Sequence, residues 1–350
     1  MSVKWACVSA AALIFTWVPV WANGNEAISI VGSSTVFPFA KVVAERFGRT
    51  TRYKTPTIEQ IGTGGGFKEF CRKVGLDSVD IANASRRIKE SEFRHCIDNG
   101  VDAIVEVQIG YDGIVLANKR ESETYHLSRK DLYLALARYV PSPDGQKVAV
   151  DNPYQRWNEI NPALPNTPIE VLGPSTSSGT RDTFIELVMD KGCQGYAWVA
   201  DLAKRQPARY REICHLIRDD GAFIDAGEND HFILQKLNKK PDSLGIFGFS
   251  FLDQNVDIVH AAVIDGIAPS FESISSGEYP ITRALYFYVK KAHVNVVPGM
   301  TAYLREFSSE KAWGDEGYLA DKGMIPSSPA ERKKMRERVE KLETLSLENL

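Results

Sequence analysis

The segment Gly173-Pro-Ser-Thr-Ser-Ser-Gly-Thr-Arg-Asp182 decides how this sequence is interpreted. An apolar strand candidate, residues 169–172, precedes it, and an apolar run with helical spacing, residues 183–189, follows it. Small hydroxyl residues and a glycine at the start of a helix leave backbone N–H groups unpaired and place hydroxyl donors beside them. Because the helix dipole also favours negative charge at this end, the segment predicts an anion site.

Two further segments repeat this arrangement of strand, small-residue loop and helix. One such loop alone is most often an ordinary Ser/Thr helix cap, but three in one chain predict a shared ligand that carries several oxygens. Strands and helices alternate between residues 28 and 118, which predicts an α/β fold with largely parallel strands. The further segments are Gly32-Ser-Ser-Thr35, after the strand candidate 28–31, and Gly62-Thr-Gly-Gly-Gly66, after Ile61.

Residues 1–22 have the pattern of a secretory signal peptide. Lys4 gives a positive start, residues 6–18 form an apolar core, and Val20-Trp21-Ala22 places small residues at the cleavage positions. The apolar run is too short for a transmembrane helix. We therefore expect cleavage near Ala22 and a soluble protein in the periplasm. The roughly 330 residues that remain exceed one comfortable core, so two lobes are expected.

The charged, histidine and glycine-rich positions argue against several classes of function. The formal net charge of −3 becomes −4 when Lys4 leaves with the signal peptide, so no basic field attracts nucleic acid or a membrane. The six histidines show no metal spacing, and we expect neither a metal site nor a cofactor. The segment from Gly62 to Phe67 lacks the third glycine of a dinucleotide site and the glycine-lysine pair of a P-loop.

Four cysteines remain after the signal peptide: Cys71, Cys96, Cys193 and Cys214. An even number in an exported chain predicts structural disulfides. Three pairings are open to four cysteines, and short loop closure favours Cys71–Cys96 with Cys193–Cys214.

The end of the chain predicts a docked helix. Ser328-Pro-Ala-Glu331 forms a capping box with proline at the first helical position. An apolar stripe follows it, which predicts that the helix packs on the body of the protein. The stripe consists of Met335, Val339, Leu342 and Leu345.

Four ordered blocks of this sequence resemble the phosphate-binding proteins of the bacterial high-affinity phosphate ABC transporter. They are Gly32-Ser-Ser-Thr-Val-Phe-Pro38, Ile61-Gly-Thr-Gly-Gly-Gly66, Asp80-Ile-Ala-Asn-Ala-Ser-Arg86 and Ser177-Ser-Gly-Thr180. The resemblance implies a hinged, two-lobed α/β fold, a periplasmic-binding-protein fold of type II, in which the chain crosses between the lobes twice. It further implies that residues 23–110 and 282–350 form lobe 1 and that residues 111–281 form lobe 2.

The same resemblance implies a phosphate site made of hydroxyl and N–H groups from both lobes. Fixed dipoles of this kind hold an anion with few full charges, so the acidic net charge of the chain is no obstacle. The residues implied are Ser34, Thr35, Val36, Thr63, Ser85, Ser178, Gly179 and Thr180.

The sequence departs from this family at two positions. Related proteins carry an arginine shortly before the Ser-Gly-Thr motif, where this chain has Pro174 and Ser175. We expect Arg181, directly after the motif, to bind phosphate in its place; an ordinary surface position on the helix is the alternative.

The second departure affects the choice between phosphate and sulfate. Related proteins follow the serine of the third block with an aspartate that accepts a proton from phosphate, whereas Ser85 is followed here by Arg86, which we place at the site. Asp112, in a glycine-flanked turn, is the candidate proton acceptor, and a purely turn-stabilising role is equally consistent with its position. Glu228 and Asp230 are weaker candidates.

The function implied is the capture of inorganic phosphate by a monomer and its delivery to the ABC permease in the inner membrane. The alternatives are binding of another tetrahedral oxyanion, sulfate or molybdate, and hydrolysis of phosphate esters outside the cell. Hydrolysis is disfavoured because no histidine is linked by sequence to Ser177 or Ser178, and neither serine lies in a Gly-x-Ser-x-Gly motif. We therefore expect a binding protein and no catalytic residue.

Overall fold

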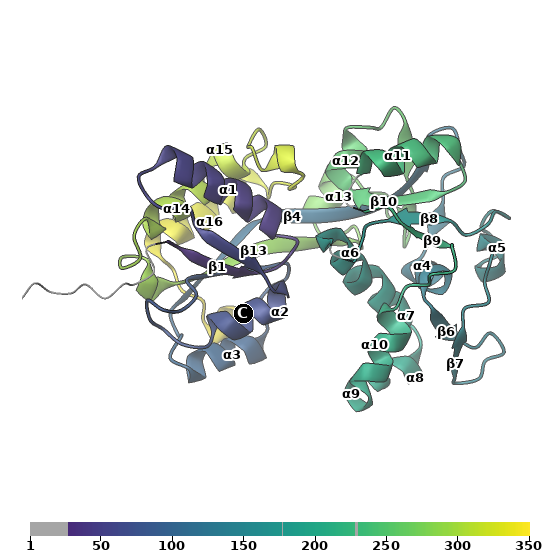
Figure 1. Cartoon of the computed structure of the whole chain (residues 1–350), viewed down its shortest axis with the longest axis horizontal. Coiled ribbons are helices and arrows are strands. Elements are labelled where there is room, and N and C mark those ends of the chain that lie inside the picture. Colours follow the sequence, from purple (N-terminus) through teal and green to yellow (C-terminus); the bar gives the residue numbers. More distant parts are fainter. Residues whose placement is uncertain (1–26, 177, 228–229) are drawn as a thin grey trace, which may run out of the picture.

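The computed structural model describes residues 27–176, 178–227 and 230–350, so the predicted signal peptide, Ser177 and Glu228 lie outside it. The described chain forms two α/β lobes joined by two strands, β4 (Ile104–Lys119) and β13 (Thr282–Lys290), as Figure 1 shows. The predicted α/β fold is confirmed. Within these ranges, no helix has both the length and the apolar character needed to cross a membrane.

Lobe 1 is built on a mixed sheet. Its other strands are β1 (Ser29–Gly32), β2 (Thr57–Gln60) and β3 (Ile81–Ala84). The sheet order is β2-β1-β3-β13-β4, and β1 pairs in parallel with both β2 and β3. β13 runs antiparallel to β3 and to β4. The predicted parallel pairing therefore holds for the early strands, while the strand that returns from lobe 2 makes the sheet mixed.

Helices cover both faces of this sheet. They are α1 (Phe37–Thr50), α2 (Gly62–Phe70), α3 (Glu90–Asp98), α14 (Met300–Phe307), α15 (Glu310–Trp313) and α16 (Pro329–Lys341). Alternate residues of a strand point to opposite faces, and β13 shows this directly. Phe287 joins the core under α1, α14 and α16, whereas Tyr288 joins the core under α2 and α3. The sheet of lobe 1 is thus buried on both sides.

Lobe 2 contains a second sheet that shares β4. Its strands are β8 (Val171–Gly173), β9 (Phe223–Asp225), β10 (Leu244–Gly248) and β11 (Val259–Ala261). β8 pairs in parallel with β9 and β10, and β10 and β11 run antiparallel to β4. Two short pairs lie apart from this sheet: β5 (His126–Leu127) with β12 (Val263–Ile264), and β6 (Tyr139–Pro141) with β7 (Ala149–Asp151).

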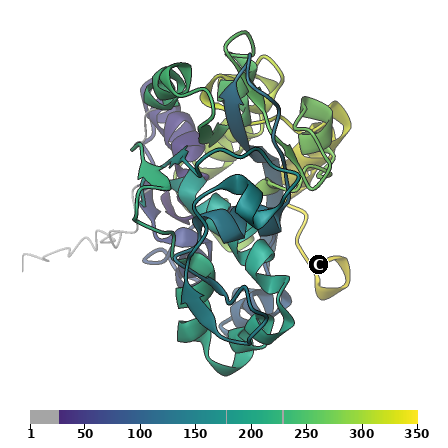
Figure 2. The ribbon, with the colours of Figure 1, turned by 90° about the vertical axis from the view of Figure 1, so that its right-hand side faces the viewer.

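The helices of lobe 2 surround this sheet. They are α4 (Arg129–Leu136), α5 (Trp157–Ile160), α6 (Gly179–Phe184), α7 (Asp190–Gln194), α8 (Ala197–Ala200), α9 (Leu202–Arg205), α10 (Pro207–His215), α11 (Asp230–Lys239), α12 (Phe249–Asp253) and α13 (Phe271–Ser275). A π-helical turn, Ile185–Met189, joins α6 to α7. Seen from the side of lobe 2, these helices lie in front of lobe 1 (Figure 2).

The two lobes meet on β4, which is 16 residues long. Its first part, residues 104–113, pairs with β13, and its second part, residues 114–119, pairs with β10 and β11. Next to the change of partner, Tyr111 exchanges two backbone hydrogen bonds of 2.7 and 2.9 Å with Ile325. The crossing is therefore held by β13 and by a segment close to the C-terminal helix.

Both favoured disulfide pairs are present. The Cα atoms of Cys71 and Cys96 are 4.2 Å apart, and this bond ties the end of α2 to α3. The Cα atoms of Cys193 and Cys214 are 5.5 Å apart, and this bond ties α7 to α10. Each lobe thus contains one disulfide between neighbouring helices.

The C-terminal helix has the predicted cap. Ser328 precedes α16, its side chain accepts a hydrogen bond from the Glu331 N–H, and the reciprocal bond of the capping box is present. Met335 and Val339 pack into the lobe 1 core. The helix ends earlier than the predicted stripe, because Leu342 adopts the left-handed conformation at the cap. Leu345 instead packs in the core under α2 and α3.

Candidate functional site

The three small-residue segments each lie at the start of a helix, but the segment Gly62–Gly66, predicted as a loop, instead forms the first turns of α2. Ser33–Thr35 connects β1 to α1, Ile61 precedes α2, and the loop after β8 leads into α6. Within the described residues, no side chain caps α1 or α2. At α6, the Ser178 hydroxyl accepts a hydrogen bond of 3.2 Å from the Thr180 N–H. Each of these helix ends has backbone N–H groups without an intrahelical partner, which suit an anion.

A cleft of about 230 Å³ brings together the lobe 1 candidates other than Val36. Within it, the Thr63 and Ser85 hydroxyl oxygens lie 3.0 Å apart, and the Ser85 N–H donates to the Thr63 hydroxyl at 3.1 Å. Val36 is fully buried at the start of α1. The residues that line this cleft are Ser33, Ser34, Thr35, Gly62, Thr63, Gly64, Ser85, Arg86, Asp182, Glu186 and Arg283.

A second cleft of about 530 Å³ shares Ser34 and Thr35 with the first. It brings in the lobe 2 candidates Ser178, Gly179 and Thr180, together with Asp112 and Asp230. The candidate residues from the two lobes therefore line two neighbouring clefts, which share Ser34 and Thr35.

The two lobes already touch at this boundary. The Ser34 hydroxyl donates to the Asp182 carboxylate at 2.8 Å, and the Thr35 hydroxyl donates to the Gly179 carbonyl at 3.4 Å. A Cβ atom added at Gly179 would lie 2.9 Å from both the N and the Cα of Thr35. The glycine is thus required for the close approach of the two loops.

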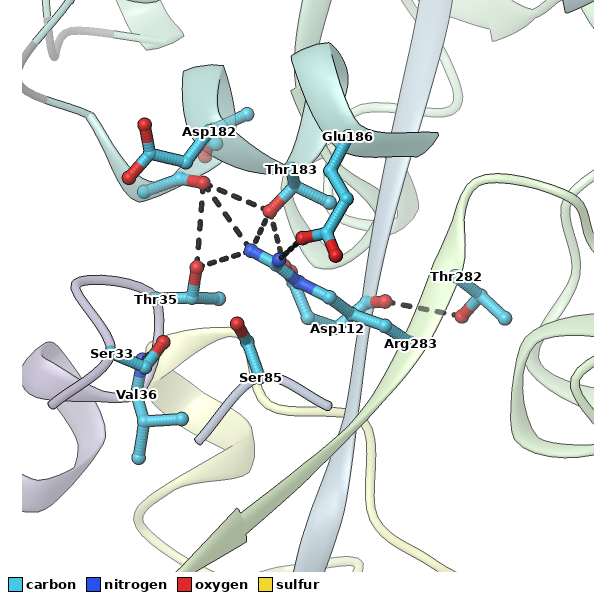
Figure 3. Close-up of polar contacts among 12 residues, drawn as sticks. Ser33, Thr35, Val36, Ser85, Asp112, Asp182, Thr183, Glu186, Thr282 and Arg283 are labelled. Carbon is cyan, nitrogen blue, oxygen red and sulfur yellow. Dashed lines mark hydrogen bonds and ion pairs between the residues drawn. The ribbon is translucent and has the colours of Figure 1, made fainter. Parts of the chain in front are cut away.

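Arg283 lies at the centre of these contacts (Figure 3). It belongs to β13 and is only 8% exposed. Its guanidinium donates to the hydroxyls of Thr35 and Thr183, the first from lobe 1 and the second from lobe 2. It also donates to the Gly179 carbonyl at 3.5 Å and to the Glu186 carboxylate at 3.2 Å. A single buried cation therefore contacts groups of both lobes.

Asp112 lies opposite Arg283 in the pairing of β4 with β13. Its carboxylate oxygen lies 3.7 Å from the Arg283 Nε, and the Thr183 hydroxyl donates to it at 3.4 Å. Burial raises the pKa of the Asp112 carboxyl group and lowers the pKa of Arg283, while the attraction between the two charges opposes both shifts. Asp112 thus serves as a counterion of the buried arginine.

The two arginines expected at the site lie in different environments. Arg86 lines the smaller cleft, but Glu92 binds it with two hydrogen bonds of 2.9 and 2.7 Å, and this contact raises the pKa of Arg86. Arg181 is 8% exposed and lies over the Phe223 ring, 4.3 Å from its centroid. It donates to the Pro174 carbonyl at 3.3 Å, and burial lowers its pKa.

The position of Arg181 follows from where α6 begins. Successive helical residues are rotated by about 100°, so Arg181 and Phe184, three positions apart, share a face of the helix. Phe184 is fully buried in the lobe 2 core, and Arg181 is therefore directed into lobe 2. Within the described chain, Arg181 lines neither of the two clefts. It is also buried, so it is not the exposed helix residue of the alternative.

Three charged residues that line the smaller cleft were not predicted from the sequence: Arg283, Asp182 and Glu186. Arg283 is a charge in an otherwise largely apolar strand, and Asp112 is an acid in the other crossing segment; an antiparallel pairing of the two would have brought them together. Asp182 and Glu186 follow Ser178 at intervals of four, the spacing of one helix face. This spacing could have predicted from the sequence that both carboxylates lie on the same side of the helix as Ser178.

Comparison with known proteins places the chain in context. A family model described as a PBP superfamily domain matches residues 18–311. Protein SphX of Synechococcus elongatus is 30% identical over 275 residues, which are 75% of this chain and 69% of that protein. The phosphate-binding protein PstS of Staphylococcus saprophyticus is 26% identical over 306 residues, 85% of this chain and 81% of that protein.

Solved structures agree with these sequence relatives. The crystal structure of a possible phosphate binding protein from Planctomyces limnophilus superposes with a TM-score of 0.71 at 27% identity. The superposition covers 91% of this chain and 99% of that one. An ABC-type phosphate transport receptor from Vibrio cholerae, at 19% identity and a TM-score of 0.57, shares the fold.

Proposed function

Because the chain belongs to the PBP superfamily, we propose that it binds inorganic phosphate between its lobes and delivers it to the permease of an ABC transporter. One observation carries the proposal: helix N-termini from both lobes, with their hydroxyl residues, line two neighbouring clefts that share Ser34 and Thr35. The proposed ligands are Ser34, Thr35, Val36, Thr63, Ser85, Ser178, Gly179 and Thr180, with Arg283 as the buried cation. The names of PstS and of the Planctomyces limnophilus protein support phosphate as the ligand.

In this proposal, the exported protein acts as a monomer in the periplasm and as a carrier, not an enzyme. A permease that prefers the closed, liganded form over the open one makes delivery directional, because only differential affinity for two states shifts their populations. The acidic chain has no role with nucleic acid.

Calorimetry on the protein from Asn23 onward tests the ligand. We expect one phosphate per chain, and a chromogenic phosphate ester should not be turned over. Tight binding of sulfate or molybdate without any phosphate heat would instead support the general oxyanion alternative. Turnover of the ester would support the hydrolase.

Removing either lobe 2 hydroxyl should weaken phosphate binding. Ser178→Ala and Thr180→Ala each delete one hydrogen bond to a charged ligand, worth about 1.5–3 kcal/mol, or roughly ten- to a hundredfold in Kd. Calorimetry measures the change. Ser309→Ala is the matched control, because Ser309 caps α15, outside the residues that line the two clefts, by accepting from the Ala312 N–H. Unchanged affinity in both cleft variants would remove this loop from the site.

A methyl group at position 179 should prevent full closure. In Gly179→Ala, the new Cβ would meet the Thr35 backbone at 2.9 Å, and neither backbone segment is free to move aside as a side-chain end would. Overpacking of this kind costs about 1–3 kcal/mol, which predicts phosphate affinity roughly five- to a hundredfold weaker. Small-angle scattering should also show less compaction on adding phosphate. Normal compaction in this variant would contradict the contact.

A further inference from the structure

The two sides of the smaller cleft present different chemical groups to an anion. Lobe 1 contributes hydroxyl and N–H donors, from Ser34 and Thr63 among others, whereas lobe 2 contributes two carboxylates, Asp182 and Glu186. These carboxylates lie four residues apart, on α6 and on the π-helical turn that follows it. In the smaller cleft, an anion bound to lobe 1 therefore meets these two carboxylates when lobe 2 closes over it.

The two carboxylates have different partners. Glu186 accepts a hydrogen bond from Arg283 at 3.2 Å, and it is thereby paired with a cation. Asp182 accepts a bond from the neutral Ser34 hydroxyl at 2.8 Å, and in the described part of the chain it forms no ion pair within 4.0 Å. The hydrogen-bond partner of the Asp182 carboxylate is therefore a neutral O–H group, whereas the partner of Glu186 is a cation.

The charged side chains that line the smaller cleft leave no excess of positive charge. Arg86 and Arg283 balance Asp182 and Glu186 among the lining residues, and Glu92 and Asp112 pair with the two arginines from behind. An unprotonated anion oxygen that faced Asp182 would be repelled. A protonated oxygen would instead donate a hydrogen bond to the carboxylate, as an O–H group does.

We propose that Asp182 accepts the acidic proton of the bound anion, so that the site selects hydrogenphosphate and rejects sulfate. This inference rests on the proposed phosphate function. In the structure, the Ser34 hydroxyl donates to Asp182 in the way that a P–O–H group of the ligand would donate. Because the acceptor Asp182 belongs to lobe 2, whereas the donors Ser34 and Thr63 of the same cleft belong to lobe 1, the selection is made at closure. Sulfate can occupy the lobe 1 loops, but it does not stabilise the closed protein.

Competition calorimetry at one fixed pH tests the proposal with Asp182→Asn. An amide offers an N–H donor to a bare oxygen, so sulfate binding should improve while phosphate binding weakens. We expect the ratio of phosphate to sulfate affinity to fall roughly ten- to a hundredfold, the range for one hydrogen bond to a charged group. Sulfate should compact Asp182→Asn in small-angle scattering, but it should not compact the unmodified protein.

The controls separate this proposal from its premise. Glu272→Gln removes an exposed carboxylate from the first turn of another lobe 2 helix and should leave the ratio unchanged. Asp182→Ser, with its fold checked by thermal unfolding, should lower the ratio as Asp182→Asn does. An unchanged ratio in both Asp182 variants would overturn the proposal, and so would loss of selectivity in Asp112→Asn alone. Absence of phosphate binding in the unmodified protein would instead refute the proposed function.

Discussion

Replacing Arg283 with glutamine is expected to weaken both anion binding and the folded state. Arg283 is 8% exposed and donates hydrogen bonds to Thr35 of lobe 1 and Thr183 of lobe 2. Its removal leaves Asp112, whose side chain is 15% exposed, without its cation. Breaking a buried ion pair in this way costs about 3–5 kcal/mol of unfolding free energy. The lost ligand contact should weaken phosphate binding roughly ten- to a hundredfold.

A double variant distinguishes these two effects. Arg283→Gln combined with Asp112→Asn no longer buries an unpaired charge, so urea unfolding should show recovery of most of the lost stability. Phosphate affinity measured by calorimetry should remain low, because the cation is still missing. If the single variant were as stable as the unmodified protein, the ion pair would contribute nothing; if it bound phosphate normally, Arg283 would have no part in the site.

Removing the lobe 2 disulfide should lower stability by a comparable amount. Cys193 and Cys214 are separated by 21 positions, and their bond ties α7 to α10. Opening a loop of this length raises the entropy of the unfolded chain, which corresponds to about 3 kcal/mol. The double variant Cys193→Ala with Cys214→Ala should therefore unfold at lower urea concentration, and equilibrium unfolding measures the difference.

The lobe 1 disulfide provides the matched comparison. Cys71 and Cys96 are separated by 25 positions, so Cys71→Ala with Cys96→Ala should lose a similar free energy of unfolding. Phosphate affinity should stay close to that of the unmodified protein in both cases, because none of the four cysteines lines the two clefts in the described chain. A stability loss below the error of the measurement in either pair would show that the folded state holds those helices together without the covalent bond.

The features that the sequence predicted are local ones. The anion loops, the capping box at Ser328 and the favoured cysteine pairs depend on residues within one loop, one helix end or one short closure. Arg283 could not be placed in this way, because its position depends on pairing with Asp112, 171 residues earlier in the chain. Contacts between distant segments depend on how both lobes pack, and a short sequence pattern cannot predict that packing.

Helix phase explains the other difference between expectation and structure. Arg181 directly follows the Ser-Gly-Thr motif, and proximity in sequence suggested proximity to the ligand. The phase of α6 directs Arg181 toward Phe223 and leaves Asp182, one residue later, at the cleft. An error of one position along a helix changes the direction of a side chain by about 100°, so candidates next to a motif need the helix start to be known.

Among the described strands, β13 is the last in chain order, yet it lies inside the lobe 1 sheet, between β3 and β4. Lobe 2 completes its sheet with one continuous stretch of chain, from the second part of β4 to β11. Lobe 1, although its first strands are made earliest, lacks a central strand until residue 290 has been synthesised. The lobe that starts first therefore finishes folding last. Until β13 inserts, the neighbouring edges of β3 and β4 stay unpaired, and unpaired strand edges favour aggregation of partly folded chains.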